Sequence, residues 1–67
     1  MGIIQGCFVK LKSNSEEIFR VCDITSTMMV DTLKSDGRRE VHQLSELEEI
    51  EDPALLQELE GIFNDSI

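Results

Sequence analysis

The stretch "TMMVDTLKSDGRREVHQL", residues 27–44, decides how this chain folds. Two runs typical of β-strands flank the dipeptide Asp36-Gly37, which is a strong signal for a β-hairpin because both residue types tolerate positive φ. A two-residue loop would place Lys34 opposite Arg39, and like charges directly opposite each other are unfavourable. A three-residue loop that ends at Gly37 would relieve this contact. The sequence leaves both registers open.

Two further strands are expected before this hairpin. Apolar and basic residues alternate in "CFVKLK", residues 7–12, with the period of two that is typical of a strand. The segment "EIFRVCDI", residues 17–24, has apolar residues on both faces, with Ile18, Cys22 and Ile24 expected on one of them. A strand of this kind is either buried on both faces or bends sharply between two sheets.

A short fifth strand is expected after the hairpin. In "SELEEI", residues 45–50, Ser45 and Glu48 have the spacing of a capping box, which predicts a single helical turn before the strand. A chain of 67 residues makes one domain, so residues 1–67 are expected to fold as a unit. The β part is expected to cover residues 6–51.

A helix is expected over residues 53–63. Asp52 and Pro53 suit the N-cap and the first helical position. The apolar residues that follow recur at helical spacing and form one stripe: Leu55, Leu56, Leu59, Ile62 and Phe63. We expect this stripe to close an open face or end of the β part, against residues such as Phe19, Val21 or Met28. The alternatives are that it binds a partner, or packs on a second copy in a homodimer.

The layout "GCFVKLKS…FRVCDI…MMVDTL…DGRREVHQLSELEEI" resembles an SH3-like barrel over residues 6–51. The resemblance implies a mainly β fold: a small, strongly bent barrel of four or five strands, here followed by one C-terminal helix. SH3-like barrels serve in protein binding, RNA binding and DNA mimicry, so the fold does not choose among these. Peptide-binding SH3 domains have a groove lined by aromatic residues, whereas this chain has no Trp, no Tyr and three Phe.

The negative charge is concentrated at the C-terminal end. Residues 1–43 hold six acids and all six bases, whereas residues 44–67 hold eight acids and no base. Acids keep a small protein in solution, and those near a helix N-terminus favour the helix. They also suit a one-signed surface that binds a basic protein. We therefore expect a small, acidic, non-catalytic interaction module: an inhibitor, an adaptor or a nucleic-acid mimic. Its expected partner-binding residues are Glu46, Glu48, Glu49, Glu51, Asp52 and Glu58.

The alternative function is RNA or DNA binding by a small barrel. It would use Lys10, Lys12, Arg38 and Arg39, which cluster only if the first strand lies near the tip of the central hairpin. Nucleic-acid binding usually adds aromatic stacking or a basic net charge, but the net charge here is −8. Nucleic acid is therefore the less favoured partner.

Catalysis is not expected. His42 is the only near-neutral base, and a hairpin with a two-residue loop would pair it with Asp31 at the surface. Cys7 and Cys22 lack the spacing of a metal site and suit two small buried residues, with a disulfide as the alternative. No cofactor or metal is expected. No apolar run could span a bilayer and no signal peptide is recognisable, so we expect a cytoplasmic protein that does not bind membranes.

Overall fold

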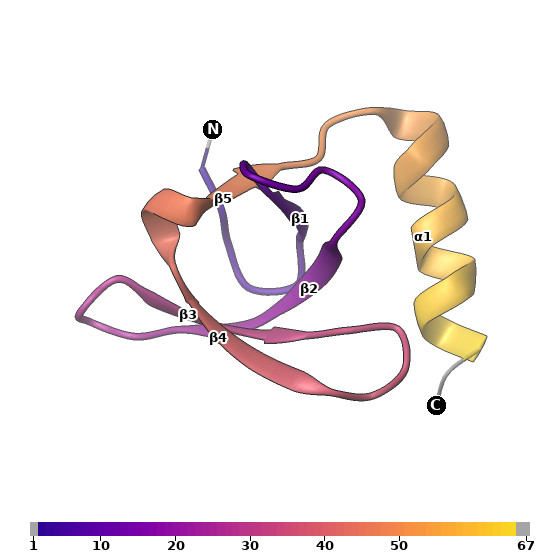
Figure 1. Cartoon of the computed structure of the whole chain (residues 1–67). Helices are drawn as coiled ribbons and strands as arrows, with labels where there is room; N and C mark the ends of the chain where they lie inside the picture. The colour runs from indigo at the N-terminus through magenta and orange to yellow at the C-terminus, as the bar shows by residue number, and fades with distance from the viewer. Residues whose placement is uncertain (1, 66–67) are drawn as a thin grey trace.

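The computed structural model describes residues 2–65, which form one antiparallel sheet and one α-helix (Figure 1). The strand order in the sheet is β4-β3-β2-β1-β5. This confirms a mainly β fold with a C-terminal helix. Within residues 2–65, β4 does not pair with β5, so the sheet is open and the closed barrel is not shown. The elements are β1 Phe8–Leu11, β2 Ile18–Ile24, β3 Met29–Leu33, β4 Arg39–Gln43, the 3-10 helix Leu44–Glu46, β5 Leu47–Glu49 and α1 Pro53–Asp65.

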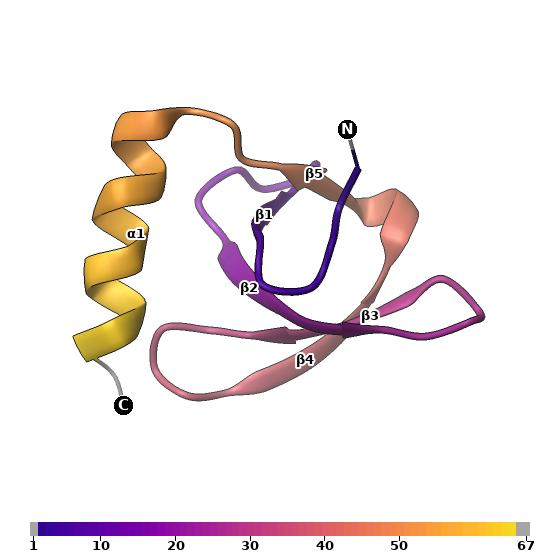
Figure 2. The same cartoon turned by 180° about the vertical axis from the view of Figure 1, so that it is seen from behind.

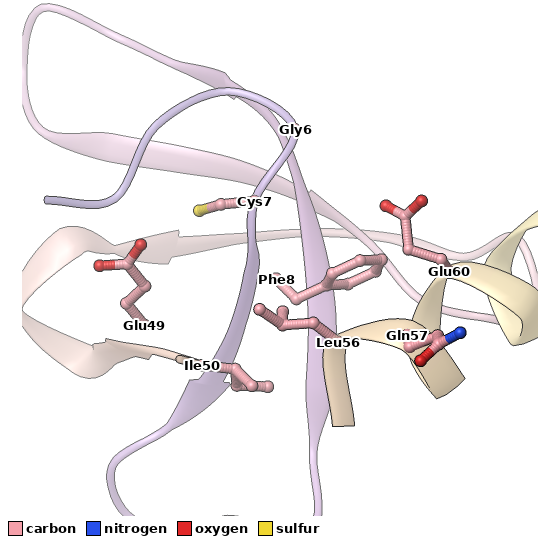
Figure 3. A pocket seen from close by; sticks show the side chains of 8 residues that line it. All are labelled: Gly6, Cys7, Phe8, Glu49, Ile50, Leu56, Gln57 and Glu60. Carbon is pink, nitrogen blue, oxygen red and sulfur yellow. The ribbon is translucent and has the colours of Figure 1, made fainter. Parts of the chain in front are cut away.

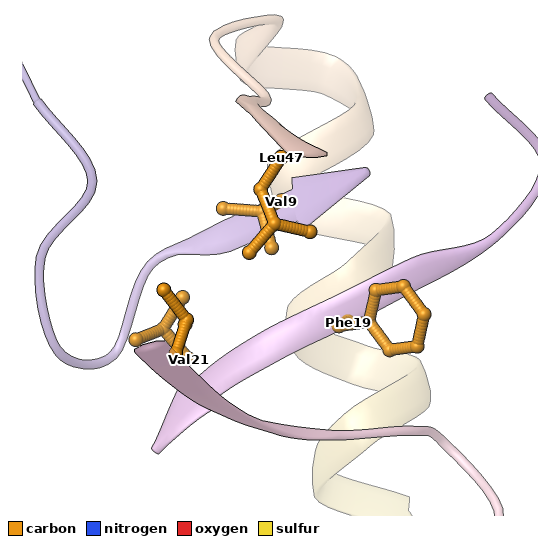
Figure 4. Packing of buried hydrophobic residues seen from close by; sticks show 5 residues of the cluster. Val9, Phe19, Val21 and Leu47 are labelled. Atoms are coloured by element: carbon orange, nitrogen blue, oxygen red, sulfur yellow. The ribbon is translucent and has the colours of Figure 1, made fainter. Parts of the chain in front are cut away.

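The main core lies on one face of this curved sheet (Figure 4). Alternation along β1 directs Val9 and Leu11 to this inner face, as the sequence predicted. Five buried residues from four strands form the cluster: Val9, Phe19, Val21, Val30 and Leu47.

A β-bulge at Cys22 bends β2. Val21 pairs with Thr32 and Asp23 pairs with Asp31, so two steps along β2 correspond to one step along β3. The extra residue reverses the alternation, and Ile24 therefore packs against the inner core. The expectation that Ile24 shares a face with Cys22 was wrong. Of the two alternatives for this strand, the bend between two sheets does not occur within residues 2–65, where all five strands belong to one sheet.

The hairpin between β3 and β4 has a three-residue loop. The backbone N–H of Lys34 donates to the carbonyl of Arg38 (2.8 Å), and the N–H of Gly37 donates to the carbonyl of Lys34 (3.0 Å). Gly37 has a φ of 91°, the left-handed conformation that such a loop requires at its last position. Of the two registers that the sequence allowed, the structure selects the one that keeps Lys34 and Arg39 apart.

The loop between β2 and β3 repeats this geometry without a glycine. The N–H of Thr25 donates to the carbonyl of Met29 (2.8 Å), and the N–H of Met28 donates to the carbonyl of Thr25 (3.1 Å). Met28 occupies the position of Gly37 and has a φ of 63°. A non-glycine residue in this conformation is strained, and the methionine side chain is 67% exposed.

Helix α1 packs on the outer face of the sheet and forms a second core (Figure 2). Leu59 and Phe63 are buried against Phe8 and Ile50, and the rings of Phe8 and Phe63 lie 5.0 Å apart. The expected helix and its packing on the sheet are confirmed, but the expected contacts were wrong. Phe19 and Val21 face the inner core and Met28 is exposed. The apolar surface on the outer face, where α1 packs, is supplied by β1 instead.

Two caps fix the chain around β5. The carboxylate of Asp52 accepts the N–H of Ala54 (3.0 Å), which confirms Asp52 as the helix N-cap. The capping box lies two residues before the expected one: the carboxylate of Glu46 accepts the N–H of Gln43 (3.1 Å). The 3-10 helix therefore starts at Leu44, and Glu48 is left on β5.

Candidate interaction surface

Seven acids lie on β5, its two flanking connections and α1, and we call them the acidic segment. They come from consecutive parts of the chain that the structure brings around one end of the sheet and along the helix (Figure 1). Six of them are exposed, whereas Glu49 is half-buried. The acidic segment consists of Glu46, Glu48, Glu49, Glu51, Asp52, Glu58 and Glu60.

No member of the acidic segment makes an ion pair with another of residues 2–65. The ion pairs in that range use acids from the first part of the chain, such as Glu17 with Lys34 (3.2 Å) and Asp31 with Arg39 (3.9 Å). Lys10 stands opposite Glu48 in the β1–β5 register without forming an ion pair. Three of the six bases, Lys34, Arg38 and Arg39, pair with acids outside the acidic segment, so no ion pair within residues 2–65 neutralises its negative charge.

A groove opens where α1 meets the sheet (Figure 3). Its volume is about 460 Å³. Three segments line it: the chain leading into β1, the end of β5 and one side of α1. Two acidic-segment carboxylates reach it from different elements, Glu49 from β5 and Glu60 from α1. The full lining is Gly6, Cys7, Phe8, Glu49, Ile50, Leu56, Gln57 and Glu60.

Of these groove residues, only Glu49 was among the expected partner-binding residues. Glu60 was missed because helical spacing tells which residues share a face, but not how the helix is rotated against the sheet. The distance of Glu60 from Leu56, one helical turn, was the available signal. Glu48 lies on the other face of β5 from Glu49, since neighbouring strand residues alternate.

The four bases proposed for nucleic-acid binding do not come from neighbouring strands. Lys10 is on β1 and Arg39 is on β4, with β2 and β3 between them in the sheet. Arg38 lies 3.5 Å from Asp36, in the hairpin loop, and Arg39 pairs with Asp31. Lys12 follows β1 and is exposed.

His42 is held within the fold. Its Nε2 lies 3.0 Å from the carboxylate of Glu40, and its ring packs 4.8 Å from the ring of Phe19. The side chain is only 16% exposed. The expected partner, Asp31, was wrong because the three-residue loop shifts the register by one and places Val41 opposite Asp31.

The remaining features of the described residues concern metals, thiols and membranes. Cys7 and Cys22 are free and half-buried, so the alternative of a disulfide is wrong. Among residues 2–65, no group of three or more histidine, cysteine or acidic side chains is placed to hold a metal ion. No helix in the described range has the length and apolar character needed to cross a bilayer.

Comparisons of the chain with protein-family models, curated proteins and solved structures find no match.

Proposed function

We propose that this protein is a non-catalytic interaction module that binds a basic protein surface through the acidic segment. One observation carries the proposal: seven acids on β5, the connections and α1 have no ion-pair partner among residues 2–65, while the three bases that form ion pairs there, Lys34, Arg38 and Arg39, pair with acids outside the acidic segment. An unneutralised surface of one sign attracts an opposite surface at a distance and speeds its association.

The position of the acids supports this role. Asp52 and Glu46 cap turns with their carboxylates, which holds the backbone on both sides of β5 in a fixed shape. The helix is fixed by its buried stripe on the outer core. Acids on such a frame need little ordering when a partner binds, which reduces the entropy cost of association. An inhibitor or nucleic-acid mimic that occupies a basic site would gain from this rigidity.

We also propose that the open sheet curves in the same way as the sheet of an SH3-like barrel. Three observations support this: the strand order, the bulge at Cys22 that bends β2, and the 3-10 helix between β4 and β5. The backbone N–H of Leu44 donates to the carbonyl of Met28 (2.9 Å), which continues the β3–β4 ladder toward β5.

Matched charge reversals test the proposed function. Glu48→Lys with Glu51→Lys changes the acidic segment, and Glu16→Lys with Asp23→Lys changes the net charge equally elsewhere. All four side chains are exposed and form no ion pair within residues 2–65. Thermal melts verify that both double variants fold, and each is then used as bait in a cell lysate beside the wild-type protein.

At low salt, we expect the wild type and the Glu16/Asp23 variant to retain a specific basic protein that the Glu48/Glu51 variant does not retain. High salt should release this protein from both baits that retain it. Equal retention by all three baits, or retention that does not change with salt, would overturn the proposed function.

A further inference from the structure

The groove between β5 and α1 combines an apolar floor with two carboxylates. Ile50 and Phe8 are buried beneath it, and Leu56 is half-buried at its edge. The carboxylates of Glu49 and Glu60 lie on opposite sides of this apolar floor (Figure 3). Within residues 2–65, neither side chain makes a hydrogen bond or an ion pair.

This arrangement restricts the chemistry of an occupant. An anion would be repelled by both carboxylates. A wholly apolar group would leave the half-buried Glu49 less hydrated and unpaired, which is costly. A metal ion bound by protein side chains would need further ligands, which the described residues do not bring together here. The groove therefore suits a group with an apolar stem and a cationic head.

We propose that the groove binds an arginine side chain of the basic partner, and this inference rests on the proposed function. The methylene stem of an arginine packs on Leu56 and Ile50. Its guanidinium then lies between Glu49 and Glu60. The guanidinium is planar, weakly hydrated and carries five N–H donors, so it serves acceptors on two sides, whereas a lysine ammonium is a compact, strongly hydrated charge.

The acids of the acidic segment then have two different roles. Glu49 and Glu60 hold the arginine at short range, and the half-buried position of Glu49 reduces the screening of its contact by salt. Glu48, Glu51 and Glu58 are exposed and outside the groove lining, so they attract the partner without contacting the arginine.

A peptide titration followed by backbone amide NMR tests the groove directly. The probe is the acetylated and amidated heptapeptide Gly-Lys-Gly-Arg-Gly-Lys-Gly. Two further peptides replace the arginine with lysine, which keeps the charge, or with citrulline, which keeps the shape and removes the charge. We expect the arginine peptide to shift the amides of Cys7, Ile50 and Gln57, and the citrulline peptide to bind about tenfold more weakly. The lysine peptide should bind more weakly than the arginine peptide.

Charge-matched variants identify the carboxylates. We expect Glu49→Gln and Glu60→Gln each to weaken the arginine peptide by about tenfold. Their neighbours Glu48→Gln and Glu58→Gln carry the same change in charge outside the groove and should have little effect.

Equal weakening by all four variants would overturn the arginine site and leave the proposed function intact, since the peptide would then bind a diffuse acidic surface. Binding of the lysine peptide as tightly as the arginine peptide would also overturn it. Failure of all three peptides to bind at low salt would overturn the site as well. The proposed function is judged separately, by the lysate capture, which uses no peptide.

Discussion

Replacing Leu59 with alanine tests whether α1 belongs to the folded domain. Leu59 is 4% exposed and packs in the outer core with Phe8, Ile50 and Phe63. Truncating a buried leucine costs about 2–5 kcal/mol of unfolding free energy. A domain of 67 residues has a total of roughly 3–10 kcal/mol. The variant should therefore lose much of its stability, and its melting temperature should fall by at least ~10 °C.

The assay is thermal unfolding followed by far-UV circular dichroism, with Glu58→Ala as the matched control. Both substitutions place alanine at neighbouring helix positions, but Glu58 is exposed and has no ion-pair partner in the described part of the chain. The control should stay within about 0.5 kcal/mol of the wild type. Hydrogen exchange adds a local readout, since the amides from Leu56 to Leu59 should exchange slowly in the wild type. Equal melting temperatures for the two variants, together with fast exchange there, would refute the docking of α1.

Three further predictions concern positions that the fold constrains. Met28→Gly should stabilise the protein by about 1 kcal/mol by removing the left-handed strain, and Gly37→Ala should destabilise it by about as much; denaturant melts that show the same sign for both would contradict the shared loop geometry. Asp52→Ala should cost about 1 kcal/mol through loss of the N-cap, measured in the same melts, and no change would mean that the cap is not formed in solution. Thr32→Val should cost roughly 1 kcal/mol, since the buried hydroxyl donates to the Glu40 carbonyl at 2.8 Å; a variant as stable as the wild type would show that this bond contributes nothing.

The elements of this fold were largely predictable from local patterns. The Asp36-Gly37 dipeptide marked the central hairpin, and the stripe ending at Phe63 marked the helix, because both signals depend on neighbouring residues alone. The length of the hairpin loop could be determined only from the hydrogen bonds between the two strands, since Lys34 could face either Arg38 or Arg39 without changing the local pattern.

The misplaced features depend on packing between distant segments. No glycine marks the bulge at Cys22, so simple alternation put Ile24 on the wrong face. Alternation places Phe8 on the same face of β1 as Lys10, and its burial becomes visible only when α1 covers it.

The candidate site, too, was only partly predictable from the sequence. Composition alone located the acidic segment, whereas the approach of Glu60 to the groove containing Glu49 depends on how α1 is rotated against the sheet. The pairing of His42 with Glu40 likewise followed from the register of the central hairpin, which the sequence left open.

The rate at which the captured basic partner associates with the protein tests the role of the acidic segment most directly. It would be measured by stopped flow at increasing ionic strength for the wild type and the two charge-matched double variants. We expect the wild-type rate to fall steeply with salt and the Glu48/Glu51 variant to associate about tenfold more slowly at low salt, while the Glu16/Asp23 variant keeps the wild-type rate. A rate that does not depend on salt, or that falls equally in both variants, would contradict binding through the acidic segment.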